Sequence, residues 1–322
     1  MADRVNWGIL STAHINRRVI PAMGKSPRTE LRAVASRDAG KASEYASQWD
    51  IGIGYGSYEE LLDDKEIDVV YISLPNHLHT EWIIKALKSD KHVLCEKPMC
   101  LSLEEIDEIE KVQRETGKQV AEAFMYLHHP QTHFLKALIA DGKIGELRSM
   151  LSTFTANFSR GEDNYRLSNP HGGGSLWDLG VYPISFFQFI TGHNPLRCSG
   201  IGYPEVLDLR FSGLLEYPGG VSGQFTVSFD SAYSTQTILI GSSGAITISH
   251  PYNNSAKCRA WFHGETAIEE LELPRHALYL PEIEDMNDVV LLGTSPAISL
   301  GQSRGHVETV LELRKSAGGR HK

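Results

Sequence analysis

The sequence predicts a two-domain α/β protein. A doubly wound parallel sheet at the N-terminus is followed by an α/β domain with a large, open and mainly antiparallel sheet. The length of 322 residues corresponds to about two domains of ordinary size. Up to residue 123 strand-like and helical patterns alternate, as they do in parallel sheets. After that, strand-like runs follow one another at short spacing. We therefore expect one domain over residues 1–123 and a second over residues 124–322.

The first domain is expected to alternate between short apolar strands and amphipathic helices. The strands are expected at Val5–Leu10, Leu31–Ser36, Ile53–Tyr55, Asp68–Leu74, His92–Cys95 and Gln119–Ala123. The helices are expected at Asn16–Met23, Lys41–Trp49, Ser57–Leu62, Thr80–Ser89 and Ser102–Thr116. Ser57 and Ser102 are expected to cap their helices, with Glu105 completing a capping box, and Gly117 is expected to end the last helix.

The second domain is expected to contain one open sheet, two internal helices and two terminal helices. Its strands are expected at Leu147–Phe158, Leu207–Glu216, Val221–Phe229, Thr235–Ile240, Ala245–Ser249, Cys258–Phe262 and Ile268–Leu273. Its helices are expected at Thr132–Asp141, Ser175–Ile190, Glu282–Leu292 and Ser303–Lys315. Gly and Pro clusters between the strand candidates indicate turns.

Composition excludes several classes of protein. The apolar fraction of 41% and the charged fraction of 22% are typical of globular proteins. A net charge of −9 argues against nucleic-acid binding, which normally needs a basic patch. The sequence has no apolar run long enough to cross a membrane, and its start lacks a signal-peptide pattern. Four cysteines without a CxxC motif fit free thiols in a reducing compartment. We expect a cytoplasmic protein without a membrane partner.

The first strand and turn indicate a dinucleotide site. The stretch Gly8-Ile9-Leu10-Ser11-Thr12-Ala13 follows the first strand and opens a helix. Only Gly8 and Ala13 fit the G-x-G-x-x-G/A fingerprint of such sites. Small residues nevertheless let backbone N–H groups approach a pyrophosphate at a helix N-terminus. A tight turn without a ligand is the alternative.

The tip of the second strand favours NADP over NAD. Ser36 and Arg37 stand where proteins that prefer NAD usually place an acidic residue against the ribose. Arg37 suits a 2′-phosphate because a guanidinium binds phosphate through two hydrogen bonds, and Lys41 follows closely. Asp38 keeps NAD open as an alternative, since its carboxylate suits the ribose hydroxyl.

Two further stretches contain candidate catalytic residues. Glu96-Lys97-Pro98 ends the fifth strand, and ligands of open α/β sheets bind at the carboxyl ends of strands. In the second domain, Asp178 and Tyr182 are four residues apart and therefore share one helix face. Polar groups on an otherwise apolar helix need polar partners, which the hydroxyl groups of a sugar would supply.

These stretches together resemble the Gfo/Idh/MocA oxidoreductases. The segments that carry the resemblance are GILSTA, LPNHLH, LCEKP, EAFMYLHHPQ and GGGSLWDLGVYPI. The chain is most similar to the branch of dimeric dihydrodiol dehydrogenases, NADP-dependent D-xylose dehydrogenases and sugar ketoreductases, which have tyrosine at the position of Tyr182. It departs from the family at the missing middle glycine of GILSTA and at Leu127, where many members have a basic residue.

The resemblance implies an N-terminal Rossmann domain, a C-terminal domain with an open sheet, and homo-oligomers, dimers or tetramers, built through that sheet. It also implies that Lys97 and Tyr182 are catalytic. Together with the analysis of the residues, it gives a set expected to bind the cofactor, NADP or alternatively NAD: Gly8, Ser11, Thr12, Ala13, Ile15, Ser36, Arg37, Lys41, Leu74, Asn76, His79, Glu96, Lys97, Arg166 and Trp177.

A hydride-transfer mechanism fits these residues. A tyrosine hydroxyl is a poor base at neutral pH, but a nearby ammonium favours the phenolate. We therefore expect Tyr182 to exchange a proton with the reacting oxygen and Lys97 to polarise that oxygen. Asp178 is expected to orient the substrate, and Glu96 to position Lys97. No metal site is expected, because the histidines lack the three or four convergent ligands that zinc requires.

Three functions are compatible with the sequence. The first is an NADP-dependent dehydrogenase or ketoreductase acting on a sugar or cyclic polyol, which the polar residues Asp178, Asn157 and Asn164 favour. The second is a trans-1,2-dihydrodiol dehydrogenase. The rings of Phe154, Phe158 and Trp177 favour this aromatic substrate. The third is a non-catalytic NAD(P)-sensing regulatory protein, which has no need of both Lys97 and Tyr182.

Overall fold

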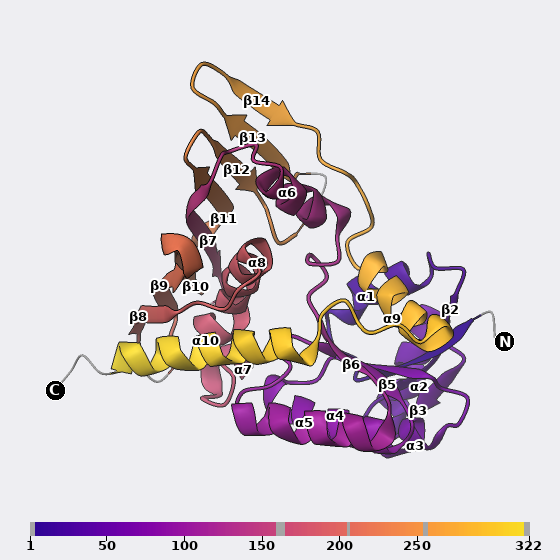
Figure 1. Cartoon of the computed structure of the whole chain (residues 1–322). Helices are drawn as coiled ribbons and strands as arrows, with labels where there is room; N and C mark the ends of the chain where they lie inside the picture. Colours follow the sequence, from indigo (N-terminus) through magenta and orange to yellow (C-terminus); the bar gives the residue numbers. More distant parts are fainter. Residues whose placement is uncertain (1–3, 159–164, 205–206, 254–256, 319–322) are drawn as a thin grey trace. The chain divides into compact units, whose positions relative to one another are not determined.

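The computed structural model describes residues 4–158, 165–204, 207–253 and 257–318. The chain divides into two compact units (Figure 1). The first comprises Met1–Met125 and Ala277–Arg304, and the second comprises Tyr126–His276 and Gly305–Lys322. The sequence pattern predicts a second domain over all residues after 123. Residues 277–304 differ from that expectation because they return to the first unit.

The first unit contains a six-stranded parallel sheet in the order β3-β2-β1-β4-β5-β6, the arrangement of a Rossmann fold. Its strands are β1 (Val5–Leu10), β2 (Thr29–Ala35), β3 (Ile53–Tyr55), β4 (Val69–Ile72), β5 (His92–Glu96) and β6 (Val120–Ala123). The inner strands are continuous apolar runs because helices cover both faces of such a sheet. The predicted doubly wound sheet is confirmed.

The helices of the first unit are α1 (Asn16–Met23), α2 (Ala39–Trp49), α3 (Tyr58–Asp63), α4 (His79–Lys88), α5 (Leu103–Thr116) and α9 (Leu280–Leu292). The predicted caps are confirmed. The Ser57 side chain accepts a hydrogen bond from the N–H of Glu60, and Ser102 forms a capping box with Glu105. Gly117 ends α5 at a φ of 72°, a conformation that glycine adopts without strain.

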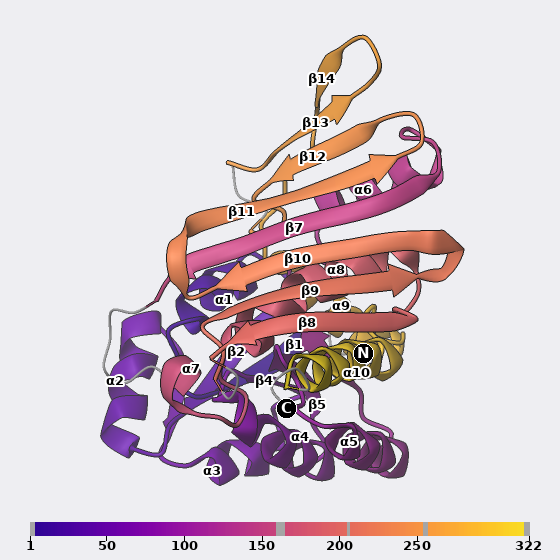
Figure 2. The ribbon, with the colours of Figure 1, turned by 90° about the vertical axis from the view of Figure 1, so that its left-hand side faces the viewer.

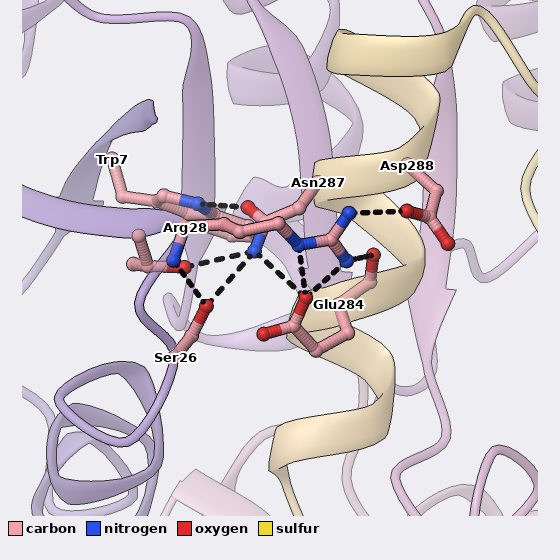
Figure 3. Close-up of polar contacts among 7 residues, drawn as sticks. Trp7, Ser26, Arg28, Glu284, Asn287 and Asp288 are labelled. Atoms are coloured by element: carbon pink, nitrogen blue, oxygen red, sulfur yellow. Dashed lines mark hydrogen bonds and ion pairs between the residues drawn. The ribbon is translucent and has the colours of Figure 1, made fainter. Parts of the chain in front are cut away.

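Helix α9 packs on the first sheet although it follows the whole second sheet in sequence. Its buried residues Ile283, Met286 and Val289 belong to the core around β1. Asn287 accepts a hydrogen bond from Trp7 Nε1 at 3.0 Å and donates one to Thr29 Oγ1 at 2.9 Å (Figure 3). The Arg28 guanidinium pairs with Glu284 and Asp288 on the same helix. Periodicity predicts such a helix but does not indicate the sheet on which it packs.

The second unit contains an eight-stranded sheet in the order β14-β13-β12-β11-β7-β10-β9-β8. Its strands are β7 (Leu147–Asn157), β8 (Arg197–Tyr203), β9 (Arg210–Tyr217), β10 (Val221–Ser228), β11 (Asp230–Gly241), β12 (Ala245–Ser249), β13 (Arg259–His263) and β14 (Ile268–Leu271). All pairs are antiparallel except β7 and β10, which are parallel. The expected open, mainly antiparallel sheet is confirmed, but β8 was not predicted.

The helices of the second unit are α6 (Pro130–Ala140), α7 (Tyr165–Ser168), α8 (Val181–Thr191) and most of α10 (Leu300–Gly318). Figure 2 looks onto the sheet from the side opposite α6 and α8, so that these helices lie behind the strands. None of the helices in the described ranges is long and apolar enough to span a membrane.

The predicted helix Ser175–Ile190 differs from the structure in its first turn. Residues Leu176–Gly180 form a π-helical turn, and α8 follows from Val181. A Cβ on Gly180 would lie 2.7 Å from Leu176 Cδ1, so a side chain here would displace the buried Leu176 where this wider turn passes into the α-helix. Such turns are frequent at functional sites.

Candidate functional site

Four candidate cofactor residues of the first unit lie in loops at one edge of its sheet. Strands β2, β1, β4 and β5 are neighbours in the sheet, and because they are parallel their carboxyl ends share one edge. Ser11, Ser36, Leu74 and Lys97 each follow one of these four strands. The topology thus gathers residues that are far apart in sequence at the edge where open α/β sheets bind ligands.

The loop after β1 is held by its own side chains. Ser11 has a φ of 104°, and its Oγ accepts a hydrogen bond from the N–H of Ala13 at 3.2 Å. Ser11 Oγ also lies 3.0 Å from Ser73 Oγ, and Asn16 donates to the Ser11 carbonyl at 2.8 Å. Helix α1 begins here without an acidic residue in its first turn. A helix start of this kind favours an anion such as a pyrophosphate.

Gly8 has a packing role inside β1. A Cβ at this position would lie 2.8 Å from Leu61 Cδ2 and 3.1 Å from Ile67 Cδ1. The absent side chain therefore lets α3 and the segment before β4 approach the sheet. Gly8 thus has a packing role inside the strand, whereas Ser11, Thr12 and Ala13 form the turn itself.

At the tip of β2, the Asp38 carboxylate is engaged in helix capping. It accepts a hydrogen bond from the N–H of Lys41 at 2.9 Å and is the N-cap of α2. Arg37 and Lys41 are exposed, and Ser36 is buried. This capping hydrogen bond engages the Asp38 side chain. It therefore disfavours the alternative in which Asp38 binds a ribose hydroxyl.

His79 is enclosed by backbone carbonyl groups. Its exposed fraction is 0%. Its Nε2 lies 2.8 Å from the Leu74 carbonyl oxygen, and its Nδ1 lies 2.8 Å from that of Pro98. Both ring nitrogens thus face the protein's own backbone. The sequence analysis grouped this histidine with the cofactor residues, but its contacts in the structure are internal to the first unit.

Glu96 is the partner of a buried tyrosine. Its Oε1 accepts a hydrogen bond from Tyr71 Oη at 2.5 Å. Burial raises the pKa of Tyr71 well above its ordinary value, and Glu96 adds to this effect, so the phenol remains a donor. Glu96 itself is half-buried at the end of β5, directly before Lys97.

In the second unit, Arg166 and Asp178 form an ion pair. Arg166 Nε lies 3.0 Å from Asp178 Oδ2, and the Asp178 side chain is 8% exposed. The Asp178 carboxylate raises the pKa of the Arg166 guanidinium, and Tyr182 contributes in the same direction. The sequence predicts that Asp178 needs a polar partner, and Arg166 is such a partner.

Asp208 orders the glycine-rich turn before the helix of Tyr182. Its Oδ2 accepts hydrogen bonds from Ser175 Oγ at 2.6 Å and from the N–H of Leu176 at 2.8 Å. Gly174 has a φ of 94°, and a Cβ there would lie 2.6 Å from Asp208 Oδ1. Sequence reasoning missed Asp208, because no local pattern connects it with a turn more than thirty residues earlier.

Aromatic rings surround Tyr182. Its ring centroid lies 5.3 Å from that of Phe154, 5.4 Å from Tyr252 and 5.8 Å from Tyr126. Tyr182 is 9% exposed and Trp177 is 3% exposed. Such packing fixes the ring, so the hydroxyl is held in one direction. Asn164 lies outside the described residues.

The predicted catalytic residues are divided between the two units. Lys97 belongs to the first, whereas Asp178 and Tyr182 belong to the second, together with Arg166 and Trp177. Among the residues that the structure describes, no group of three His, Cys, Asp or Glu side chains is placed to hold a metal ion.

Comparison with known proteins identifies the family. A family model described as an oxidoreductase family with an NAD-binding Rossmann fold matches residues 5–124. A model of the GFO/IDH/MocA C-terminal domain matches residues 132–247. The chain belongs to the Gfo/Idh/MocA family of oxidoreductases. This family member is an NAD(P)-dependent oxidoreductase.

Relatives of this Gfo/Idh/MocA oxidoreductase match nearly its whole length. It is 33% identical to D-xylose 1-dehydrogenase (NADP(+)) 2 from Haloferax volcanii over 97% of each chain. It is 31% identical to trans-1,2-dihydrobenzene-1,2-diol dehydrogenase from Sus scrofa over 98% of this chain and 97% of the relative. The crystal structure of a 3-ketoreductase from Actinomadura kijaniata with NADP and TDP-benzene matches with a TM-score of 0.89 and 29% identity, covering 97% and 98% of the two chains.

Proposed function

We propose that the protein is an NADP-dependent oxidoreductase that transfers a hydride between nicotinamide and the carbinol or carbonyl carbon of a sugar or cyclic polyol. The observation that carries this proposal is Lys97 at the carboxyl end of β5, in a chain related along its length to a D-xylose dehydrogenase named for NADP. When bound, nicotinamide accepts the hydride in oxidation or donates it in reduction.

The first unit offers residues that fit NADP. The start of α1 and the turn Ser11–Ala13 suit the pyrophosphate. Arg37 and Lys41 suit a 2′-phosphate, because both are exposed while the neighbouring carboxylate of Asp38 is engaged in capping. Leu74 and Asn76 follow β4, and Glu96 is the last residue of β5. All three are proposed to line the remainder of the cofactor site.

The chemistry of the substrate oxygen is assigned to residues of the chain. In oxidation Tyr182 accepts the hydroxyl proton, and in reduction it returns a proton to the carbonyl oxygen. The Lys97 ammonium stabilises negative charge that develops on that oxygen. The ion pair of Arg166 with Asp178 is proposed to orient the substrate beside Tyr182, and Trp177 is proposed to line the same site.

A steady-state assay at 340 nm tests this function. NADP⁺ and NAD⁺ are offered with aldoses, inositols and trans-dihydrodiols. Lys97→Ala and Tyr182→Phe are assayed beside the native protein. We expect turnover with one class of sugar or polyol, faster with NADP⁺, and a loss of at least about 100-fold in kcat in each variant. Tight NADPH binding without turnover in either direction would instead favour the sensing protein.

A trans-dihydrodiol dehydrogenase is the second candidate. The rings of Phe154, Tyr252 and Tyr126 around Tyr182 favour a flat, partly apolar substrate, and the Sus scrofa relative is named for such an activity. In the same assay, turnover of a trans-dihydrodiol with a lower KM than any sugar would select this candidate.

We also propose that a second copy of the chain covers the exposed face of the second sheet. Ile201 is 61% exposed and Leu214 is 50% exposed on this face, which Figure 2 presents to the viewer. Both line a groove of about 610 Å³ that crosses the sheet. Exposed apolar patches of this kind mark protein interfaces. Sedimentation equilibrium is expected to show an oligomer, and Ile201→Lys with Leu214→Lys is expected to give monomers.

A further inference from the structure

The second peptide group after Lys97 is held from both sides. It joins Pro98 to Met99, the two residues that follow Lys97. The carbonyl oxygen of Pro98 lies 2.8 Å from His79 Nδ1. The N–H of Met99 donates a hydrogen bond to Glu122 Oε1 at 3.0 Å. His79 is 0% exposed and Glu122 is 2% exposed, so both contacts are shielded from water.

These contacts join three neighbouring strands. Glu122 lies in β6, and the held peptide follows β5. The second ring nitrogen of His79 lies 2.8 Å from the carbonyl oxygen of Leu74, which follows β4. Strands β4, β5 and β6 are adjacent in the sheet. His79 and Glu122 therefore tie the loop that contains Lys97 to the strands on either side of it.

The chemistry of the two side chains suits this task. A neutral imidazole donates to one of the two carbonyl groups, and a charged one donates to both. Burial lowers the pKa of His79, whereas the two carbonyl acceptors and the Glu122 carboxylate oppose this shift. The ring keeps at least one N–H in either form. The hydrogen bond from the Met99 N–H to Glu122 does not depend on the protonation of the His79 ring.

We propose that His79 and Glu122 are positioning residues for Lys97, which fix the Pro98–Met99 peptide group and, through Pro98, set where the ammonium of Lys97 points. The proposal rests on the proposed role of Lys97 in hydride transfer. A lysine side chain is long and flexible, so the direction in which it leaves the backbone decides its reach. Misplacement of a catalytic group by about 1 Å can reduce the rate by about 100-fold.

Matched variants separate the hold on Met99 from the charge of Glu122. Glu122→Ala removes the acceptor, whereas Glu122→Gln keeps a carbonyl oxygen at that place without the charge. His79→Asn keeps a donor near the position of Nδ1 but loses the bond to Leu74. Asn287→Ala removes buried hydrogen bonds at α9 in the same unit and is the control for a general loss of stability.

Three properties of the full-length protein are measured. They are the hydrogen-exchange rate of the Met99 amide, the NMR order parameter of the Lys97 ε-carbon, and the kcat together with the Kd for NADPH. For Glu122→Ala we expect exchange at least about tenfold faster, a more mobile Lys97, and kcat lower by about 10- to 100-fold, with Kd changed by less than about threefold. Glu122→Gln is expected to restore most of each value. His79→Asn is expected to fall between the two.

The outcomes are distinguishable from a failure of the proposed function. Unchanged exchange and unchanged Lys97 order in Glu122→Ala would overturn the positioning role, whatever happens to kcat. Equal effects in Asn287→Ala would also overturn it, since they would reflect stability alone. If the native protein turns over no alcohol or ketone, the proposed function fails, but exchange and Lys97 order still decide whether the two residues fix Lys97.

Discussion

The carboxyl group of Glu282 is buried in the first unit. Neither of its oxygens has a hydrogen-bond partner among the described residues. Its exposed fraction is 0%. Burial raises its pKa well above the ordinary value, and Glu96 and Asp285 add to the effect. The folded protein therefore holds a proton here that the unfolded chain releases near pH 4 to 5.

This proton makes stability depend on pH. The folded-state pKa is raised, so the contribution of Glu282 is fully present below the unfolded pKa and is lost as the pH rises toward the folded pKa. Glu282→Gln removes that dependence. We expect the Tm of the variant to exceed that of the native protein by a margin that grows from pH 5 to pH 9, reaching a few degrees. A margin that does not change with pH would contradict this account.

Single residues also show what the sequence can and cannot reveal. The capping role of Asp38 was not predicted, because the helix was expected to begin at Lys41, although aspartate directly before a helix is a common N-cap. The positions of Lys97 and Tyr182 followed from strand order and family motifs. Asp208 and Glu122 were not accessible as parts of the site, because their hydrogen bonds join segments that only the folded chain brings together.

Among the elements, the glycine-rich turn before Tyr182 requires glycine both for its backbone conformation and for its space. In Gly174→Ala the new Cβ would lie 2.6 Å from Asp208 Oδ1, at a φ of 94°. Asp208 would then have to release Ser175 and Leu176. We expect a loss of about 2–4 kcal/mol and a lower kcat, because the helix of Tyr182 starts from this turn. Thermal unfolding and the 340 nm assay measure the two effects.

Gly142→Ala is the matched control in the same unit. Gly142 also has a positive φ, 76°, but a Cβ there would meet nothing within 4 Å. Its substitution is expected to lower stability by about 1–2 kcal/mol, the conformational penalty alone. Equal losses in the two variants would show that the contact with Asp208 does not matter.

Regular elements were largely predictable, and the exceptions have physical causes. Continuous apolar runs located every strand of the first unit, and alternating patterns located most strands of the second. Strand β8 was missed because its sequence, Arg197–Tyr203, contains two glycines and exposes Ile201 and Tyr203. The π-helical turn at Leu176–Gly180 was missed because its periodicity is close to that of an α-helix over so few residues.

On the scale of the whole molecule, the first unit depends on a segment from the far end of the chain. Asn287 on α9 accepts the Trp7 indole N–H, so Asn287→Ala leaves a buried donor without its partner. We expect a loss of about 2–3 kcal/mol, seen as a lower midpoint in urea unfolding followed by tryptophan fluorescence. Asp288→Ala on the same helix, which breaks a partly exposed ion pair with Arg28, is expected to cost about 1 kcal/mol or less.

The return of residues 277–304 to the first unit also determines the order of events while the chain is being made. Translation at about 5–20 residues per second takes roughly 8 to 30 seconds to pass from Met125 to Ala277. During that time the apolar surface that α9 later covers has no partner within the chain. The first unit therefore cannot complete its core until α9 has been synthesised.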